Sequence, residues 1–477
     1  MIDNLTMLTD YYELCMANGY FQNHMENKIA CFDMFFRKVP DNGGFAIMAG
    51  VEQLIDYLKE LKFTDEDITY LRGRGFDEAF LRYLKNFKFS CDVWAVPEGT
   101  PVFPGEPIVT VLGPVAEAQL IETMLLLLIN HQSLIATKAS RIVRAAQGRA
   151  VMEFGSRRAQ GASGAVYGAR AAYIAGCVGT ACTISDREFG VPALGTMAHS
   201  WIQLFDNELD AFEAYAVQYP DNCVLLVDTY NTLKSGVPNA IRAFNEVLVP
   251  MGKRPAGIRI DSGDITYLSK KARKMLDEAG FSDCKICASN SLDEYLIRDM
   301  LLQGAQVDTF GVGERLITSS STPVFGGVYK LAAVERSGEL TPRIKISENV
   351  AKITNPGFKK VYRLFDRTSG KAIADVITMH DETIDDTKPY ELFDPEYTWK
   401  RKTITDYVAK PLQVQIFDKG ACVYTSPALK DIRAYCAQQL NTLWDEVTRF
   451  ENPHHYYVDL SQKLWDLKAK LLSAHHS

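Results

Sequence analysis

The sequence predicts an α/β protein whose central part is built on parallel strands. Between residues 150 and 313, short apolar runs end in polar or glycine-rich clusters, and helical patterns lie between them. The cluster residues Asp228, Asp261, Ser289 and Gly311 follow one another at intervals of 33, 28 and 22 residues, and a strand–helix unit needs about 30 residues. The chain has 477 residues, of which 47% are hydrophobic and 23% charged, enough for a large globular core. A parallel barrel and an open doubly wound sheet both fit this pattern.

Mixed strand and helix patterns precede the repeat. Residues 30–36 and 45–48 are strand-like. Prolines and glycines divide residues 93–112 into short apolar runs, which is typical of short antiparallel strands. A long helical pattern covers 117–146. We therefore predict an N-terminal α+β domain over residues 1–140.

Five apolar runs are the candidate parallel strands, because strands buried on both faces of a sheet are continuously apolar. They cover residues 151–154, 224–227, 256–260, 285–288 and 307–310. Ser291–Glu294 has the capping-box pattern, which predicts a helix that starts directly after the fourth run. We assign residues 141–325 to this α/β domain.

Strand and hairpin patterns return after the α/β domain. The predicted elements are strands at 328–334, 360–364 and 414–417, and helices at 428–450 and 460–472. We assign residues 326–477 to a C-terminal region of strands and helices that packs on the N-terminal domain.

Charge and composition exclude several classes of function. Lys and Arg number 52 and Asp and Glu 59, so the net charge is −7, and sequence-independent nucleic-acid binding needs a basic face. The ten cysteines are scattered without a disulfide framework, as expected for reduced thiols in the cytoplasm. The first residues have no basic start and no long apolar stretch, so we expect neither a signal peptide nor a membrane span.

Polar clusters at the predicted strand ends indicate a phosphate-containing ligand. Guanidinium groups bind phosphate or carboxylate, glycines let backbone N–H groups approach phosphate, and carboxylates hold Mg²⁺ or ribose hydroxyls. The cluster residues are Arg157, Arg158, Asp228, Arg259, Asp261, Ser262, Gly263, Asp264, Ser289, Asn290, Gly311 and Gly313. Any single cluster is explained better by turns and helix caps, but five in succession, with arginines among them, favour a phosphorylated sugar.

His199 is the strongest single candidate for a catalytic residue. It lies in Gly195–Ser200 (Gly-Thr-Met-Ala-His-Ser), between an apolar run and a helical pattern that starts at Trp201. A lone histidine is more often structural than catalytic. Among the eight histidines, however, only His199 shares the strand-end position of the Arg and Asp clusters.

These motifs, in this order, resemble the nicotinate phosphoribosyltransferase family over most of the chain. The matching segments are Leu8–Tyr12 (Leu-Thr-Asp-Tyr-Tyr), Glu153–Gly161, Gly195–Ser200, Asp228–Tyr230, Arg259–Asp264, Ser289–Asn290, Gly311–Gly313 and Gly326–Leu331. The resemblance implies an irregular parallel α/β barrel of the type II phosphoribosyltransferase kind. It also implies a flanking mixed α+β domain, a C-terminal extension, and a homodimer with sites at the subunit interface.

The resemblance also implies a reaction. Nicotinate, phosphoribosyl pyrophosphate, ATP and water would give nicotinate mononucleotide, pyrophosphate, ADP and phosphate, a step of NAD biosynthesis. ATP would act as a co-substrate that transiently phosphorylates His199. Mg²⁺ would be held mainly by the substrate phosphates, with Asp261 as the candidate protein ligand.

Residue roles follow from the same resemblance. The implied catalytic residues are His199, Asp261 and Arg259. Nicotinate would be bound by Tyr12, Phe154, Arg157, Thr196 and Arg259, with Tyr12 contributed by the other subunit. The phosphoribosyl group and its phosphates would be bound by Arg158, Asp228, Ser262, Gly263, Ser289, Asn290, Gly311 and Gly313.

Two departures from the family pattern bear on the function. Relatives that use nicotinamide carry an acid shortly after a Gly-Thr pair, whereas Gly179-Thr180 is followed by Ala181, which favours a carboxylate substrate. Many relatives have a hydroxyl residue where Glu314 follows the Gly-x-Gly segment, and we assign Glu314 no role. The alternatives are a nicotinamide or quinolinate phosphoribosyltransferase, a non-catalytic nucleotide-sugar sensor, and a metal-dependent phosphohydrolase.

Overall fold

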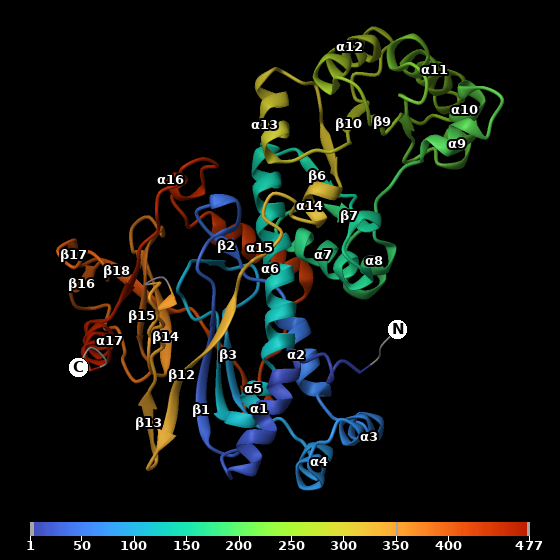
Figure 1. Cartoon of the computed structure of the whole chain (residues 1–477). Coiled ribbons are helices and arrows are strands. Elements are labelled where there is room, and N and C mark those ends of the chain that lie inside the picture. Colours follow the sequence, from blue (N-terminus) through green and yellow to red (C-terminus); the bar gives the residue numbers. More distant parts are fainter. Residues whose placement is uncertain (1–3, 350–351, 475–477) are drawn as a thin grey trace. The chain divides into compact units, whose positions relative to one another are not determined.

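The computed structural model describes residues 4–349 and 352–474, and Figure 1 shows the chain with its elements labelled. The chain forms two compact units. Unit 1 combines the segments Met1–Leu134 and Val324–Ser477, and unit 2 is the intervening segment Ile135–Pro323. The long helix α6 (Glu122–Ala145) runs from the first segment of unit 1 into unit 2.

Unit 1 is built on a seven-stranded antiparallel sheet with the order β13-β12-β1-β5-β3-β19-β20. Its strands are β1 (Ile29–Phe35), β3 (Asp92–Ala95), β5 (Val109–Pro114), β12 (Val328–Arg336), β13 (Glu339–Pro342), β19 (Val414–Asp418) and β20 (Ala421–Cys422). The central strand β1 is buried over most of its length. Its one carboxylate, Asp33, accepts a hydrogen bond from Thr110 Oγ1 (2.8 Å) and pairs with Lys359 Nζ (2.7 Å), so the buried charge is compensated.

A second sheet of unit 1 has the order β18-β14-β15-β21. Its strands are β14 (Lys359–Asp366), β15 (Ala372–Met379), β18 (Tyr407–Pro411) and β21 (Val458–Leu460), and two-stranded pairs are formed by β2 (Ala46–Ile47) with β4 (Pro101–Val102) and by β16 (Tyr390–Phe393) with β17 (Arg401–Ile404). The helices of this unit are α1 (Tyr11–Gln22), α2 (Val51–Glu60), α3 (Asp65–Gly73), α4 (Glu78–Lys85), α5 (Val115–Leu120), α15 (Leu429–Leu440), α16 (Asp445–Thr448) and α17 (Gln462–Ser473).

The single helix predicted over 428–450 is wrong, since α15 and α16 are separate. The carbonyl oxygens of Asn441 and Leu443 accept hydrogen bonds from Lys371 Nζ, and that of Thr442 accepts one from Ala372 N. These partners on another segment replace the helical hydrogen bonds, so the helix stops there.

Unit 2 carries six parallel strands. They are β6 (Ala150–Glu153), β7 (Gly179–Thr180), β8 (Val224–Leu226), β9 (Gly257–Ile260), β10 (Lys285–Ala288) and β11 (Thr309–Val312). The sheet order is β7-β6-β11-β10-β9-β8, and every pairing is parallel. The last strand, β11, thus returns to pair with the first, β6, which is the strand order of a barrel that is interrupted between β7 and β8.

Helices and short turns connect these strands. They are η2 (Ser156–Arg158), α7 (Ala162–Ile174), α8 (Thr183–Phe189), α9 (His199–Gln203), α10 (Glu208–Gln218), α11 (Val237–Ala243) between two π-helical turns (Thr232–Gly236 and Phe244–Leu248), α12 (Ile265–Glu278), α13 (Glu294–Leu302) and α14 (Glu314–Ile317). The predicted α/β class is confirmed.

The capping box predicted at Ser291–Glu294 is wrong. The N-cap of α13 is Asp293, whose carboxylate accepts from the backbone N–H groups of Tyr295 and Leu296. Glu294 is the first helical residue and pairs with Lys138 Nζ (2.8 Å) and Arg141 Nε (2.9 Å) in the interior of unit 2. The Glu294 side chain therefore forms a buried ion pair and is not available for the capping box.

Within the described part of the chain, no helix combines the length and apolar character needed to span a membrane. All ten cysteines are free thiols, and most are buried.

Candidate active site

Most of the predicted site residues lie at one edge of unit 2. Strands β6, β8, β9, β10 and β11 are parallel, so their carboxyl ends meet at the same edge, where sites form in α/β folds. Phe154, Asp228, Asp261 and Ser289 each follow one of these strands directly or within two residues. The segment with Thr196 and His199 connects β7 to β8, at the interruption of the barrel order.

Arg259 organises this edge. It is a residue of β9, and its side chain is only 15% exposed. Its guanidinium donates to Ser289 Oγ (2.8 Å), Asp261 Oδ1 (3.0 Å) and Thr196 Oγ1 (3.3 Å). Its central carbon also lies 5.7 Å from the ring centroid of Phe154, within cation–π range. One planar cation thus connects β9, β10, the segment before α9 and the aromatic residue after β6.

One carboxylate pairs with Arg259, and a second is hydrogen-bonded to the segment that carries the first. Asp261 Oδ1 accepts from the guanidinium and also from Ser289 Oγ. Asp228 Oδ2 accepts from Asp261 N (3.0 Å) and Ser262 Oγ (2.6 Å). Asp228 Oδ1 is buried and has no hydrogen-bond partner among the residues described. Each carboxylate therefore keeps one oxygen outside this network, and such oxygens suit ribose hydroxyls or a divalent cation.

His199 is the first residue of α9 and is 40% exposed. Its Nδ1 lies 3.0 Å from Thr229 Oγ1, and its Nε2 lies 3.9 Å from Asp261 Oδ2. When Nδ1 carries the proton and donates it to Thr229, the lone pair of Nε2 is free to act as a nucleophile. Sequence reasoning missed Thr229, although its position directly after Asp228, at the end of β8, was the available signal.

Phe154 packs against glycine on the neighbouring strand β11. A Cβ atom added to Gly311 would lie 2.6 Å from Cδ2 of the Phe154 ring, well inside ordinary contact. Phe154 N also donates to Val312 O (2.8 Å). The ring is therefore held by a surface that only glycine provides at this position.

Arg157 and Arg158 lie in the turn η2 after β6, and both side chains are exposed. Neither guanidinium forms a hydrogen bond or ion pair with the residues described. Gly263 (φ +77°) and Asn290 (φ +98°) adopt left-handed conformations directly after β9 and β10, which turns the chain sharply at the strand ends.

Tyr12 is the one predicted site residue in unit 1. It lies on α1 and is 46% exposed. Burial of its hydroxyl and the neighbouring Glu122 carboxylate raise the pKa of Tyr12, so it is a neutral phenol at pH 7.

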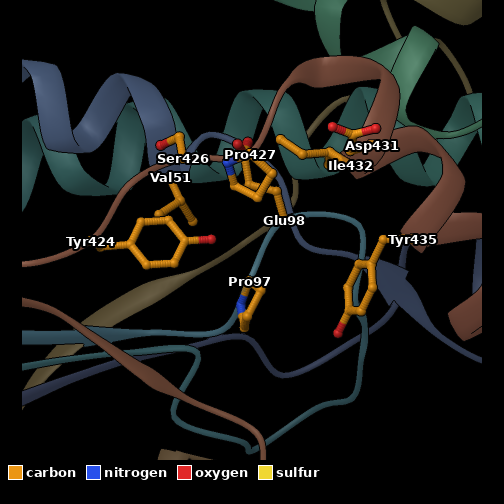
Figure 2. Close-up of a pocket in the computed structure, with 9 residues that line it drawn as sticks. All are labelled: Val51, Pro97, Glu98, Tyr424, Ser426, Pro427, Asp431, Ile432 and Tyr435. Atoms are coloured by element: carbon orange, nitrogen blue, oxygen red, sulfur yellow. The ribbon is translucent and has the colours of Figure 1, made fainter.

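Two cavities lie away from this edge. One, of about 320 Å³ in unit 1, is lined by Glu98, Ser426, Asp431 and apolar or aromatic side chains, and Figure 2 shows the rings of Tyr424 and Tyr435 on opposite sides of Pro97. The other, of about 530 Å³, lies at the amino ends of β6, β10 and β11. Neither is lined by a predicted site residue.

Comparisons with known proteins cover nearly the whole chain. Family models of nicotinate phosphoribosyltransferase match residues 7–130 (N-terminal domain), 149–365 (the family model itself) and 358–468 (C-terminal domain). The nicotinate phosphoribosyltransferase of Bacillus subtilis is 45% identical, over 98% of this chain and 95% of that protein. The human enzyme of that name is 30% identical, over 96% and 95%.

Solved structures show the same fold. The crystal structure of human nicotinic acid phosphoribosyltransferase covers 98% of this chain and all of its own, with a TM-score of 0.84 and 28% identity. A nicotinate-nucleotide pyrophosphorylase from Pyrococcus furiosus covers 92% and 96%, with a TM-score of 0.70 and 23% identity. The predicted irregular α/β barrel with its flanking domain is therefore confirmed.

The interrupted parallel barrel, with cationic and carboxylate side chains at its carboxyl edge, is that of a phosphoribosyltransferase. Among the phosphoribosyltransferases, the chain belongs to the nicotinate phosphoribosyltransferase family.

Proposed function

We propose that the protein transfers the phosphoribosyl group of phosphoribosyl pyrophosphate to nicotinate, with ATP hydrolysis coupled through His199. The products are nicotinate mononucleotide, pyrophosphate, ADP and phosphate, a step of NAD biosynthesis. Membership of the family supports the transfer. The observation that carries the coupling is the position of His199, whose side chain is 40% exposed and whose Nε2 lies 3.9 Å from the Asp261 carboxylate that pairs with Arg259.

Nicotinate is proposed to lie against Phe154. A flat pyridine ring stacks well on an aromatic ring, which contributes on the order of 1 kcal/mol. The exposed guanidinium of Arg157 binds its carboxylate, and Thr196 and Arg259 border the same pocket. Tyr12 completes it from the second copy of a homodimer, and we propose this homodimer to be cytoplasmic.

The phosphoribosyl group is proposed to bind along the ends of β8 to β11. Asp261 and Asp228, both half-buried, accept hydrogen bonds from ribose hydroxyls. The 5′-phosphate and pyrophosphate are bound by hydroxyls, backbone N–H groups and one exposed cation. These groups belong to Arg158, Ser262, Gly263, Ser289, Asn290, Gly311 and Gly313.

The transfer itself needs no general base, because the pyridine nitrogen carries its own lone pair. That nitrogen forms a bond to C1 of the ribose as the bond from C1 to the pyrophosphate oxygen breaks. The positive charge that develops on the ribose is stabilised by the Asp261 carboxylate, and positioning supplies most of the acceleration.

ATP is proposed to phosphorylate His199. The Nε2 atom of His199 attacks the γ-phosphorus of ATP. The bond from this phosphorus to the β–γ bridging oxygen breaks, and ADP leaves. Thr229 Oγ1 accepts a hydrogen bond from Nδ1–H and so holds the reactive tautomer. Water later cleaves the N–P bond, which releases phosphate and restores the histidine. While it lasts, the phosphate adds negative charge beside the binding edge.

Mg²⁺ is the proposed cofactor. It prefers oxygen ligands and retains phosphates and waters around it. Asp261 Oδ2 and the buried Asp228 Oδ1 lie outside the hydrogen-bond network, so the donor set fits such an ion, with Asp261 as the protein ligand and substrate phosphates as the others. When bound, the ion screens the charge of pyrophosphate.

One assay tests the proposal. Purified protein, Mg²⁺ and phosphoribosyl pyrophosphate are incubated with nicotinate or nicotinamide, with and without ATP, and the mononucleotide is measured. We expect turnover with nicotinate, stimulated by ATP. His199→Asn should lose this stimulation, and the exposed His455 gives the matched control His455→Asn. Turnover with nicotinamide alone contradicts the substrate assignment, and full stimulation in His199→Asn contradicts the phosphohistidine.

A further inference from the structure

Glu153 is a buried carboxylate directly beneath the candidate nicotinate pocket. It is the last residue of β6, immediately before Phe154, and its exposure is 0%. A carboxylate in such a place is costly unless hydrogen bonds compensate for the lost hydration. Burial raises the pKa of Glu153, which agrees with its position in the interior.

Both oxygens of this carboxylate have partners. Oε2 accepts from Thr180 Oγ1 at 2.6 Å, and Oε1 accepts from the backbone N–H of Gly155. The backbone carbonyl of Glu153 accepts from Ala181 N at 2.8 Å. Glu153 and Thr180 are register partners on the parallel strands β6 and β7, so their side chains lie on the same face of the sheet.

Two of these hydrogen bonds, from Thr180 Oγ1 and Ala181 N, join the segment that follows β6 to the one that follows β7, and the third, from Gly155 N, lies within the first segment. The first segment carries Phe154 and the Arg157 turn, and the second carries Ala181. Thr180 extends the second side of this junction, because its hydroxyl also accepts from Cys182 N at 3.0 Å. The junction is tightly packed, since Gly155 lies against Ile317. A Cβ atom added to Gly155 would lie 2.6 Å from Cβ of Ile317.

We propose that Glu153 and Thr180 form a clamp that positions Phe154 relative to Ala181 and thereby sets the affinity and selectivity for the pyridine substrate. This inference rests on the proposed function, because it concerns the same pocket. Glu153 is a positioning residue, since its side chain is fully buried and both carboxylate oxygens are bound by Thr180 and Gly155. The clamp requires an acceptor at both oxygens, which a carboxylate supplies and an amide supplies at only one.

The experiment compares Glu153→Gln, Thr180→Val, Thr180→Ser and the double variant Glu153→Gln/Thr180→Val. Steady-state kinetics give the KM for nicotinate, the KM for phosphoribosyl pyrophosphate, kcat, and the ratio of kcat/KM for nicotinate to that for nicotinamide. Asp308→Asn is the matched control. The Asp308 carboxylate accepts from Ile286 N (2.8 Å) at the opposite edge of the same sheet, so the variant removes a carboxylate charge from that edge and leaves the clamp intact.

We expect the KM for nicotinate to rise about tenfold in Glu153→Gln and Thr180→Val, as for a lost hydrogen bond to a buried charge. The KM for phosphoribosyl pyrophosphate should change less than twofold. Thr180→Ser keeps the hydroxyl and should retain the wild-type KM, and the double variant should be no worse than either single variant, because both break one unit.

Two results would overturn the clamp: equal changes in both KM values, or a nicotinate KM in Thr180→Val that matches Thr180→Ser. If Glu153→Gln does not fold, the two Thr180 variants still decide the outcome. A wild-type protein that does not turn over nicotinate contradicts the proposed function instead. The clamp is then tested by thermal unfolding, in which the penalties of Glu153→Gln and Thr180→Val must be non-additive for it to stand.

Discussion

Gly311→Ala should weaken nicotinate binding by displacing the Phe154 ring. The new Cβ would lie 2.6 Å from Cδ2 and 2.8 Å from Cε2 of that ring, whereas ordinary contacts begin at 3.4 Å. The ring must therefore shift by about 0.8 Å, and overpacking of this kind costs about 1–3 kcal/mol of stability. If the shift removes a stacking contribution of about 0.5–1.5 kcal/mol, the KM for nicotinate rises about twofold to twelvefold.

The assay measures the KM for both substrates together with the urea unfolding midpoint. Gly257→Ala is the matched control. Its Cβ would lie 2.8 Å from Lys285 O at the amino end of β9, so it strains the same sheet at the edge opposite the site. We expect both variants to lose stability and only Gly311→Ala to lose nicotinate affinity. A nicotinate KM in Gly311→Ala within the error of that in Gly257→Ala would refute the reasoning.

Three further predictions concern single side chains. Thr229→Val removes the hydrogen-bond partner that holds the tautomer of His199. We expect about tenfold less ³²P-labelled protein after incubation with γ-labelled ATP, as for loss of a positioning hydrogen bond. Unchanged labelling would contradict this role of Thr229. Burial raises the pKa of Glu13 from 4.5 to about 7. The folded state thus keeps a proton that the unfolded state loses, so wild-type stability should fall by up to about 3 kcal/mol as the pH rises from 4.5 to 7. Urea titrations of Glu13→Gln should lack this slope, and an equal slope in both proteins would exclude Glu13 as its source. Asp375→Asn leaves the guanidinium of Arg363, 2.6 Å from the native carboxylate and fully buried, without its counter-charge, at a cost of about 3–5 kcal/mol; a loss below 1 kcal/mol in chemical denaturation would show that other groups compensate.

The strand ends were predictable because parallel strands impose a simple pattern on the chain. Apolar runs that end in polar residues placed Asp228, Asp261 and Ser289 at one edge, and the structure connects all three by hydrogen bonds. His199 was predictable by the same logic. The boundaries were less accurate: the run predicted at 307–310 became β11 at Thr309–Val312.

The contacts that the sequence did not reveal are those made between distant residues. Glu153 lies inside the apolar run 151–154, and nothing local indicated that Thr180 and Gly155 would enclose its carboxylate. Glu294 matched a local capping pattern, but its carboxylate binds Lys138 and Arg141, which lie more than 150 residues earlier in the chain. Local sequence patterns predict which helix, strand or turn carries a residue, whereas residues distant in the sequence decide which partner its buried side chain contacts.

The interleaved order of the two units has a consequence during synthesis. Strand β1 (Ile29–Phe35) lies between β5 and β12, and β12 begins only at Val328, beyond the whole of unit 2. At about 5–20 residues per second, one edge of β1 waits about 15–60 s for its partner. During this time the nascent chain presents an unpaired, largely apolar strand edge, the kind that recruits other chains. Unit 2 is contiguous and can fold meanwhile, so the first unit to begin emerging from the ribosome is the last to be completed.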